Sequence, residues 1–174
     1  MTDTPTSTRI CGQCTACCLI LGVVELNKPA HTKCSHCTPG AGCGIYDTRP
    51  KECADFQCGW IQGFGDEEDR PDRLHAVLVN TTPVKAAGGT LAFVFHLDYR
   101  GWQRPSARLC GIRDAIVKSG AICIWVHGTH ARRVFGPPAV MHQLRAFFAE
   151  QNAAVEEIDP AASAFSLVKR DQST

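Results

Sequence analysis

The run Cys11-Gly12-Gln13-Cys14-Thr15-Ala16-Cys17-Cys18 decides how the first third of this chain folds. It opens a stretch that holds nine of the eleven cysteines and continues through Cys34, Cys37, Cys43, Cys53 and Cys58. The polar N-terminus lacks the apolar segment of a signal peptide, and a reducing cytosol keeps thiols reduced. Thiols packed this densely are therefore predicted to bind Zn²⁺ or an iron–sulfur cluster rather than to form disulfides.

The spacing of these cysteines suits metal coordination but does not assign them to individual ions. A Cys-x2-Cys turn supplies two sulfurs to a tetrahedral zinc from one short loop. Such pairs occur at Cys11/Cys14, Cys14/Cys17 and Cys34/Cys37. The neighbours Cys17 and Cys18 diverge by about 100° on a helix or about 180° on a strand, so we do not expect both to serve one tetrahedral ion. The sequence predicts either two sites or one polynuclear cluster.

Two side chains close to these pairs are additional candidate ligands. His36 lies inside Cys34-Ser35-His36-Cys37, where an imidazole can replace a sulfur in a zinc shell. Cys37 is a candidate ninth thiolate or a small buried hydrophobe. The remaining cysteines, Cys110 and Cys123, lie among apolar residues and are predicted to be isolated buried thiols.

The order of these residues resembles a known family. After Cys18 the chain carries Lys28-Pro29-Ala30 before Cys34, then Cys43-Gly44-Ile45-Tyr46-Asp47-Thr48-Arg49-Pro50, Cys53 and Cys58-Gly59-Trp60. Residues 11–60 resemble the CxxCxxCC family, a bacterial cysteine-cluster group described as zinc- or iron-chelating proteins. The resemblance implies metal chelation by Cys11, Cys14, Cys17, Cys18, Cys34, Cys43, Cys53 and Cys58. Cys37 departs from the family pattern, in which an apolar residue is usual there.

The resemblance also extends to catalysis. A relative that methylates flagellin lysines carries a similar cysteine block and is thought to use an iron–sulfur cluster. This chain shows no glycine-rich strand–turn–helix signature for a nucleotide or a methyl-donor cofactor. The sequence therefore leaves open whether the protein is an enzyme.

The composition limits the classes of partner. Eighteen basic and seventeen acidic residues give a net charge of +1, which argues against nucleic acid or an anionic membrane surface. No apolar run approaches the roughly 20 residues that cross a bilayer. With 174 residues, 44% of them hydrophobic, the chain can bury a core. We expect a soluble, cytoplasmic protein that binds a metal ion and a protein partner.

Five segments follow from the distribution of residue types. Residues 10–62 are rich in Cys, Gly and Pro and have little hydrophobic periodicity, so metal binding has to supply their order. The acidic, breaker-rich residues 63–73 are typical of a linker. The predicted organisation is a disordered N-terminus (1–9), a cysteine-rich metal-binding segment (10–62), a linker (63–73), an α+β domain (74–158) and a flexible tail (159–174).

The pattern after residue 73 alternates strands and helices. Strands are predicted at Leu74–Thr82, Thr90–Tyr99, Ala121–Val126 and Arg132–Phe135, the first two as a hairpin. Helices are predicted at Arg104–Lys118 and Ala139–Glu157. The fold class is therefore predicted as α+β: a small antiparallel sheet with two helices, plus the irregular N-terminal cysteine-rich segment.

The leading functional hypothesis is a metal-chelating, non-enzymatic protein in which zinc orders the cysteine-rich segment for a scaffolding or interaction role. All-thiolate zinc shells are closed and leave no position for substrate or activated water. The alternative is an iron–sulfur enzyme or redox protein, related to protein lysine methylation, in which four cysteines hold a [4Fe–4S] cluster. Metal storage is disfavoured, because 11 cysteines in 174 residues are too few.

Overall fold

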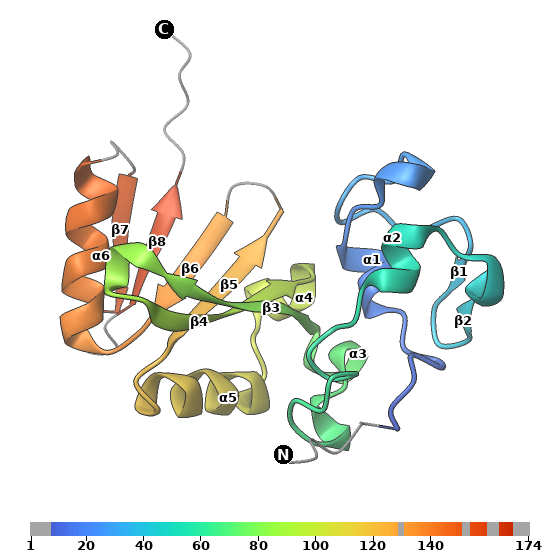
Figure 1. Ribbon diagram of the computed structural model, residues 1–174, viewed down its shortest axis with the longest axis horizontal. Coiled ribbons are helices and arrows are strands. Elements are labelled where there is room, and N and C mark those ends of the chain that lie inside the picture. Colours follow the sequence, from blue (N-terminus) through green and yellow to red (C-terminus); the bar gives the residue numbers. More distant parts are fainter. Residues whose placement is uncertain (1–7, 129–130, 151–153, 160–163, 169–174) are drawn as a thin grey trace, which may run out of the picture. The chain divides into compact units, whose positions relative to one another are not determined.

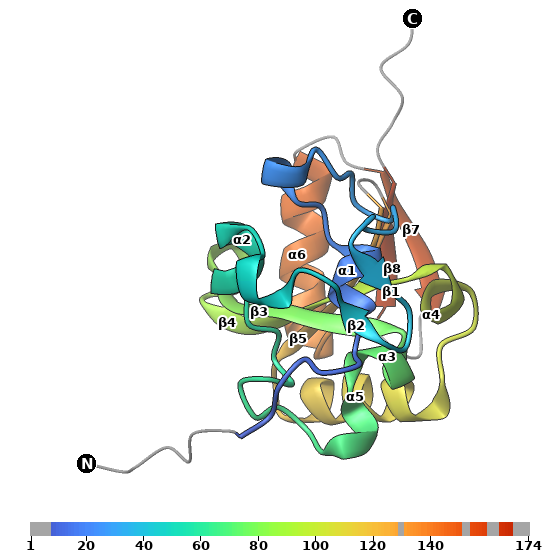
Figure 2. The ribbon, with the colours of Figure 1, turned by 90° about the vertical axis from the view of Figure 1, so that its right-hand side faces the viewer.

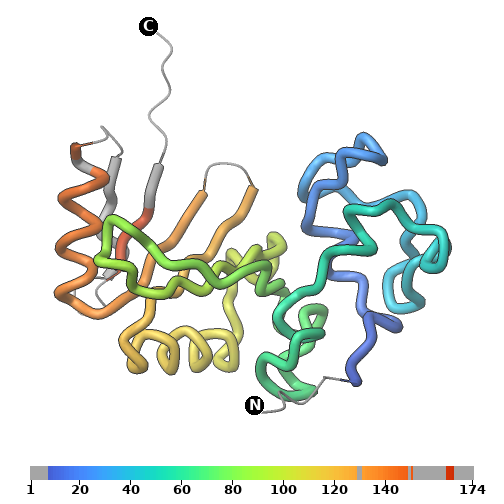
Figure 3. Tube along the Cα trace, viewed as in Figure 1, coloured from blue at the N-terminus to red at the C-terminus, as the bar shows by residue number. Residues whose placement is uncertain are grey.

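The computed structural model describes residues 8–128, 131–150, 154–159 and 164–168, and Figure 3 follows the chain through them. The chain divides into two compact units. Unit 1 comprises Met1–Val79 and His96–Ser106, and unit 2 comprises Asn80–Phe95 and Ala107–Thr174. Most of the N-terminus that we expected to be disordered, residues 1–7, lies outside the described residues. The chain passes between the units inside two strands rather than at the predicted linker.

Unit 1 contains short helical elements and one small ribbon, joined by long irregular segments (Figure 2). The helical elements are α1 (Ala16–Ile20), η1 (Val24–Leu26), η2 (Tyr46–Thr48), α2 (Lys51–Asp55), η3 (Glu67–Asp69), α3 (Pro71–Leu74) and α4 (Tyr99–Gln103), where η marks a 3₁₀ helix. The ribbon pairs β1 (Cys37–Thr38) with β2 (Gly42–Cys43) in antiparallel fashion. Helices of five residues or fewer are not stable alone, so these elements depend on their surroundings.

A small apolar cluster holds the start of unit 1. It consists of Ala16, Ile20, Cys58, Trp60 and Val77, and so joins α1 to the beginning of the main sheet. Arg9 extends this region, because its guanidinium donates hydrogen bonds to the carbonyls of Trp60 (3.1 Å), Phe64 (3.0 Å) and Gly65 (2.8 Å). Arg9, which we expected in a disordered N-terminus, is therefore anchored.

The stretch predicted as a linker, residues 63–73, has defined structure within unit 1. The Asp66 side chain caps η3 by accepting from the backbone N–H of Glu68 at 2.9 Å. Asp69 completes the capping box, since its carboxylate accepts the Asp66 N–H at 2.9 Å. Pro71 begins α3, where its missing N–H costs no helical bond. Acidic and breaker residues act here as caps of short helices.

The main sheet has six strands in the order β3-β4-β5-β6-β8-β7 (Figure 1). The strands are β3 (Ala76–Val84), β4 (Thr90–Leu97), β5 (Ile122–His127), β6 (Ala131–Phe135), β7 (Ala154–Asp159) and β8 (Ala164–Val168). The pairs β5–β6, β6–β8 and β7–β8 are antiparallel. The connecting elements of unit 2 are η4 (Lys85–Ala87), α5 (Ala107–Lys118) and α6 (Pro138–Glu150). The predicted α+β class is confirmed, but the sheet is larger than the small one expected.

Unit 2 has a continuous apolar core between α6 and the sheet. Its fully or almost fully buried members are Ala87, Ala92, Ile122, Val134, Met141, Leu144 and Phe165, contributed by η4, α6 and four strands. Trp125 of β5 is 1% exposed and stacks edge-on against Phe135 of β6, with ring centroids 4.8 Å apart. Each large apolar side chain buried in this way contributes about 1.5–3 kcal/mol. This unit therefore carries the stabilisation that a folded domain needs.

The C-terminal predictions were wrong in two places. The helix predicted to Glu157 ends at Glu150, and Ala154–Asp159 form β7 instead. Ala164–Val168, in the predicted flexible tail, form β8 between β6 and β7, whereas residues 160–163 and 169–174 lie outside the described residues. The reason is non-local, because strand pairing with β6 is not visible in the periodicity of a short segment. The other predicted strands and the first helix are present within two or three residues.

No helix in the described ranges is long and apolar enough to cross a membrane.

Candidate metal centre

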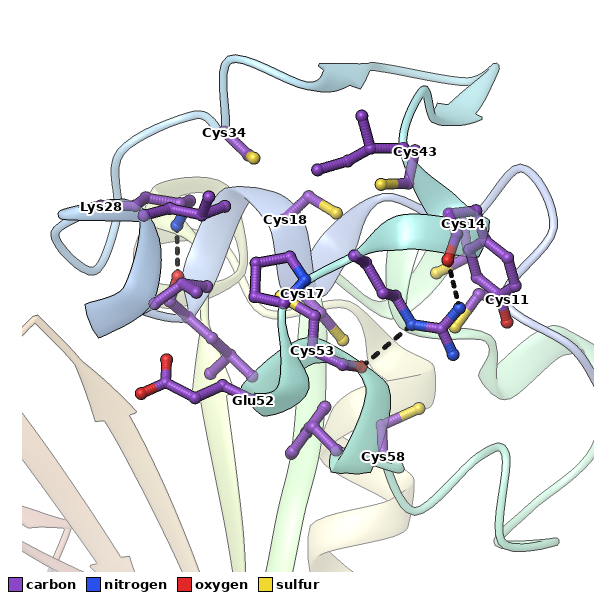
Figure 4. A pocket seen from close by; sticks show the side chains of 18 of the residues that line it. Cys11, Cys14, Cys17, Cys18, Lys28, Cys34, Cys43, Glu52, Cys53 and Cys58 are labelled. Carbon is purple, nitrogen blue, oxygen red and sulfur yellow. Dashed lines mark hydrogen bonds between the residues drawn. The ribbon is translucent and has the colours of Figure 1, made fainter.

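Eight cysteines line one cavity of about 370 Å³ in unit 1 (Figure 4). They are Cys11, Cys14, Cys17, Cys18, Cys34, Cys43, Cys53 and Cys58, the eight ligands that the resemblance implies. All eleven cysteines of the chain are free thiols. The rest of the wall is largely apolar and includes Leu21, Val23, Ile45, Phe56 and Ile61. Cysteines up to 47 positions apart in the chain thus line the same cavity.

The first cysteines are presented by a tight turn and by the start of α1. The backbone N–H of Cys14 donates to the carbonyl of Cys11 at 2.8 Å, and the turn requires φ +49° at Gly12. Such a positive φ is accessible to glycine at little cost. Cys17 and Cys18 follow within α1, where consecutive side chains point about 100° apart. The two adjacent thiols therefore point into different parts of the cavity.

The next cysteines are carried by backbone contacts with α1 and by the small ribbon. The N–H of Cys34 donates to the carbonyl of Cys18 at 3.0 Å. Cys43 lies opposite Cys37 in the β1–β2 register. A Cβ at Gly42, whose φ is +106°, would lie 2.7 Å from the carbonyl oxygen of Gly12, so only glycine allows the ribbon to approach the first turn.

The last cysteines depend on α2 and the segment after it. Cys53 lies within α2, whose N-terminal N–H groups at Lys51 (3.3 Å) and Glu52 (2.9 Å) donate to the Glu25 carboxylate. An acidic group at a helix N-terminus is favourable for the helix dipole. Cys58 is buried beside Gly59, whose N–H donates to the carbonyl of Leu78 at 2.8 Å. This bond ties the end of the cysteine-rich segment to β3.

Burial controls the proton affinity of most of these thiols. Desolvation raises the pKa of Cys14 to about 11 and that of Cys18 to about 12, and it also raises the pKa of Cys11 and Cys53. A hydrogen bond between Cys17 and Cys58 lowers the pKa of Cys58 to about 6 and raises that of Cys17. Without a cation, the thiols with raised pKa stay protonated at neutral pH, so a metal has to displace their protons.

One cation is buried in the same wall. Lys28 is 8% exposed and lines the cavity, where its Nζ donates to the carbonyls of Leu21 and Pro29. Burial lowers its pKa, and the neighbouring Cys34 and Cys18 thiols act in the opposite direction. In the described part of the chain no carboxylate forms an ion pair with Lys28. The sequence does not reveal that Lys28 lines the cavity, because lysine is normally exposed and only the tertiary structure shows its burial.

The two additional candidate ligands lie off the cavity wall. His36 is exposed, and Cys37 is buried on β1 without lining the cavity. Cys37 does form a hydrogen bond with Cys18 through their side chains. In unit 2, Cys123 is fully buried and Cys110 is half-buried, so the predicted burial holds fully only for Cys123.

The thiols surround the cavity without forming a closed shell. Among the described residues, no three His, Cys, Asp or Glu side chains form a group that could hold a metal ion as they stand. Four thiolates on one zinc need Zn–S distances of about 2.3 Å, which protonated thiols have no reason to adopt. The donor set fits a thiophilic metal in its chemistry and number, since eight sulfurs equal two tetrahedral shells. Side-chain rotation would have to complete either shell.

Comparison with known proteins assigns no family. No family model matches the chain, and no curated protein and no solved structure matches it either.

Proposed function

We propose that this protein chelates zinc through the thiolates of its eight cavity-lining cysteines and that the bound zinc orders residues 10–62. The observation that carries the proposal is the gathering of eight free thiols from distant segments around one cavity. Uncharged buried thiols offer a folded protein little stabilisation, whereas Zn²⁺ coordination supplies about 10–16 kcal/mol in small zinc-binding peptides. Zinc explains why so many cysteines face one space.

The proposed role of the metal is structural. A zinc ion with four thiolates has no open coordination position, so it holds chain segments together and does not activate water. The segments so connected are the Cys11–Cys18 region, the β1–β2 ribbon and α2, each of which is too short to be stable alone. The ordered segment then serves as a surface for a protein partner.

An iron–sulfur protein is the second candidate, and the size of the cavity favours it. A single ion does not fill a space of about 370 Å³. A [4Fe–4S] cluster held by four cysteines needs more space than one ion does, and the mostly apolar cavity offers it. Redox or catalytic chemistry would then depend on the cysteines that the cluster leaves free. This alternative includes the relation to protein lysine methylation that the resemblance implies.

One preparation separates the two candidates. The full chain is purified without oxygen and its zinc, iron and acid-labile sulfide are measured together with its visible absorption. Colourless protein with about two zinc ions per chain supports the proposal, because eight thiolates fill two shells. Brown protein with iron and sulfide in equal amounts replaces it with the second candidate. Protein free of any metal after zinc reconstitution contradicts both.

A further inference from the structure

The eight cavity cysteines fall into two groups of four by their neighbours. Cys17 is hydrogen-bonded to Cys58, and the other thiols that act on it electrostatically are Cys14 and Cys11. Cys58 is likewise the thiol neighbour with the strongest effect on Cys11 and on Cys14. We call Cys11, Cys14, Cys17 and Cys58 group A.

The other four cysteines have a separate set of neighbours. Cys18 interacts with Cys37, Cys43 and Cys34, and its carbonyl accepts the Cys34 N–H at 3.0 Å. Cys53 interacts with Cys34 and Cys43. We call Cys18, Cys34, Cys43 and Cys53 group B. In Figure 4, Cys18, Cys34 and Cys43 lie along one side of the cavity and Cys58 lies on the opposite side.

The division between the groups falls between two adjacent residues. Cys17 and Cys18 follow one another in α1, and their side chains point about 100° apart. This turn of α1 therefore contributes one thiol to group A and one to group B. Cys11 also interacts electrostatically with Cys43, more weakly than with Cys58 of its own group. Two separate ions account for this arrangement better than one cluster shared by all eight sulfurs.

Charge distinguishes the two groups. The thiols that act on the Lys28 ammonium are Cys34, Cys18 and Cys53 of group B, together with Cys37. A buried ammonium without a carboxylate partner is costly unless another anion offsets it. A zinc ion with four thiolates carries a net charge of −2, so a metal-loaded group B supplies that anion. Group A has no fully buried cation among its described neighbours; the cations that act on it are Arg49, beside Cys11, and Arg70, beside Cys14, and both are half-buried.

We propose that the cavity holds two distinct tetrathiolate zinc sites, group A and group B, and that Lys28 is a positioning residue that neutralises the group B site alone. This inference rests on the proposed function, because it presupposes that the thiols bind zinc. It adds the ligand assignment that the sequence could not make. It also predicts that the two sites differ in their dependence on a single cation.

Double substitutions test the assignment, with zinc per chain counted by native mass spectrometry of the full chain. Cys17→Ser/Cys58→Ser removes two ligands of one site, so one zinc should remain. Cys17→Ser/Cys34→Ser removes one ligand from each site, so both ions should be lost or strongly weakened. Retention of one zinc in the second variant, or loss of both in the first variant while its far-ultraviolet circular dichroism stays that of wild type, overturns the assignment.

The adjacent cysteines provide a matched pair for the role of Lys28. Cys17→Ser leaves group B intact and Cys18→Ser leaves group A intact. Adding Lys28→Met, which keeps an unbranched side chain one atom shorter but removes the charge, should weaken zinc binding in the Cys17→Ser background by about tenfold or more. It should change the affinity by less than about threefold in the Cys18→Ser background, and Lys28→Arg should restore binding. Equal effects in both backgrounds contradict the role.

A measurement on the unmodified sequence covers the case in which variants fold poorly. The metal-free chain receives one equivalent of zinc, is alkylated, and the protected cysteines are identified by peptide mass spectrometry. The inference is supported if each molecule that carries one zinc protects four cysteines of a single group, and it is overturned if cysteines of both groups are protected in the same single-zinc molecule. Binding of two zinc ions with mixed protection would leave the proposed function standing, whereas the absence of any protection would remove both.

Discussion

The two regions of this molecule reach order in different ways. Unit 2 has strand segments of five or six residues and a core of large, fully buried side chains such as Phe165 and Ile122. Residues 10–62 have two α-helices of five residues, a ribbon of two-residue strands and a small apolar cluster beside the thiol-lined cavity. The contrast teaches that apolar burial suffices for one region, whereas under the proposed function the other depends on a bound metal.

A half-buried thiol, Cys18, and a fully buried one, Cys123, show the same contrast at the level of single residues. Burial raises the pKa of both Cys18 and Cys123 to about 12. Cys18 has three thiol neighbours and a cavity to face, whereas Cys123 lies in β5 within the sheet of unit 2. Burial alone therefore does not identify a thiol as a candidate metal ligand, because a candidate ligand also needs other thiols nearby.

The largest expected effect is that of metal removal. A strong chelator at neutral pH should abolish amide protection in residues 10–62 and leave β5, β6 and β8 protected, because zinc coordination supplies folding free energy only to the first region. Hydrogen exchange followed by mass spectrometry measures both regions in one experiment. Addition of zinc should restore protection. Equal protection of residues 10–62 with and without metal would remove the contrast.

The second largest expected effect is the destabilisation of unit 2 without loss of zinc. Trp125→Ala should lower the free energy of unfolding of unit 2 by about 3–5 kcal/mol, because it leaves a cavity where the indole packs against Phe135. Zinc content measured under native conditions should stay at the wild-type value. Trp125→Phe, which retains an aromatic ring, serves as the control with a smaller shift of the urea midpoint. Loss of zinc in a folded Trp125→Ala protein would contradict the independence of the regions.

Glycine substitutions give the next smaller effect. A Cβ at Gly59 would lie 2.3 Å from Leu78 Cδ2, so Gly59→Ala should cost about 1–3 kcal/mol and shift the chain beside Cys58. At Gly111 in α5, a Cβ meets nothing within 4 Å, and Gly111→Ala should stabilise the protein by about 1 kcal/mol. Urea unfolding of the zinc-loaded variants compares the two. A Gly59→Ala protein as stable as the Gly111→Ala protein would show that the close approach at Gly59 is not needed.

The last expected effect is absent at neutral pH and develops only under alkaline conditions. Burial raises the pKa of Cys123 from 9.0 to about 12, so its protonated form is favoured in the folded state. The resulting stability is complete below pH 9 and is lost as pH rises through the interval up to about 12, by at most about 1.4 kcal/mol per pH unit. Cys123→Val should remove this dependence from unit 2. Parallel loss of stability in both proteins between pH 9 and 11 would assign the dependence to other groups.

Much of the candidate site could be predicted, because cysteine density is a local signal and the family resemblance singled out eight of the nine clustered cysteines. The eight residues expected as ligands are the eight cysteines that line the cavity, and the α+β class followed from strand and helix patterns in Leu74–Phe135. The C-terminal strands could not be predicted, because β8 owes its place to pairing with β6 across about 30 residues of chain. The burial of Lys28 was equally hidden, since lysine is normally exposed.

The sequence by itself determined which residues carry sulfur, how closely they follow one another and that residues 10–62 have too little apolar periodicity for an ordinary core. Only the tertiary structure decided that Cys17 and Cys18 have different neighbours, that Cys58 joins the first cysteines and that Lys28 lies beside Cys34. The physical reason is that composition and spacing are properties of the chain, whereas neighbours depend on turns, glycine contacts and backbone hydrogen bonds between distant segments.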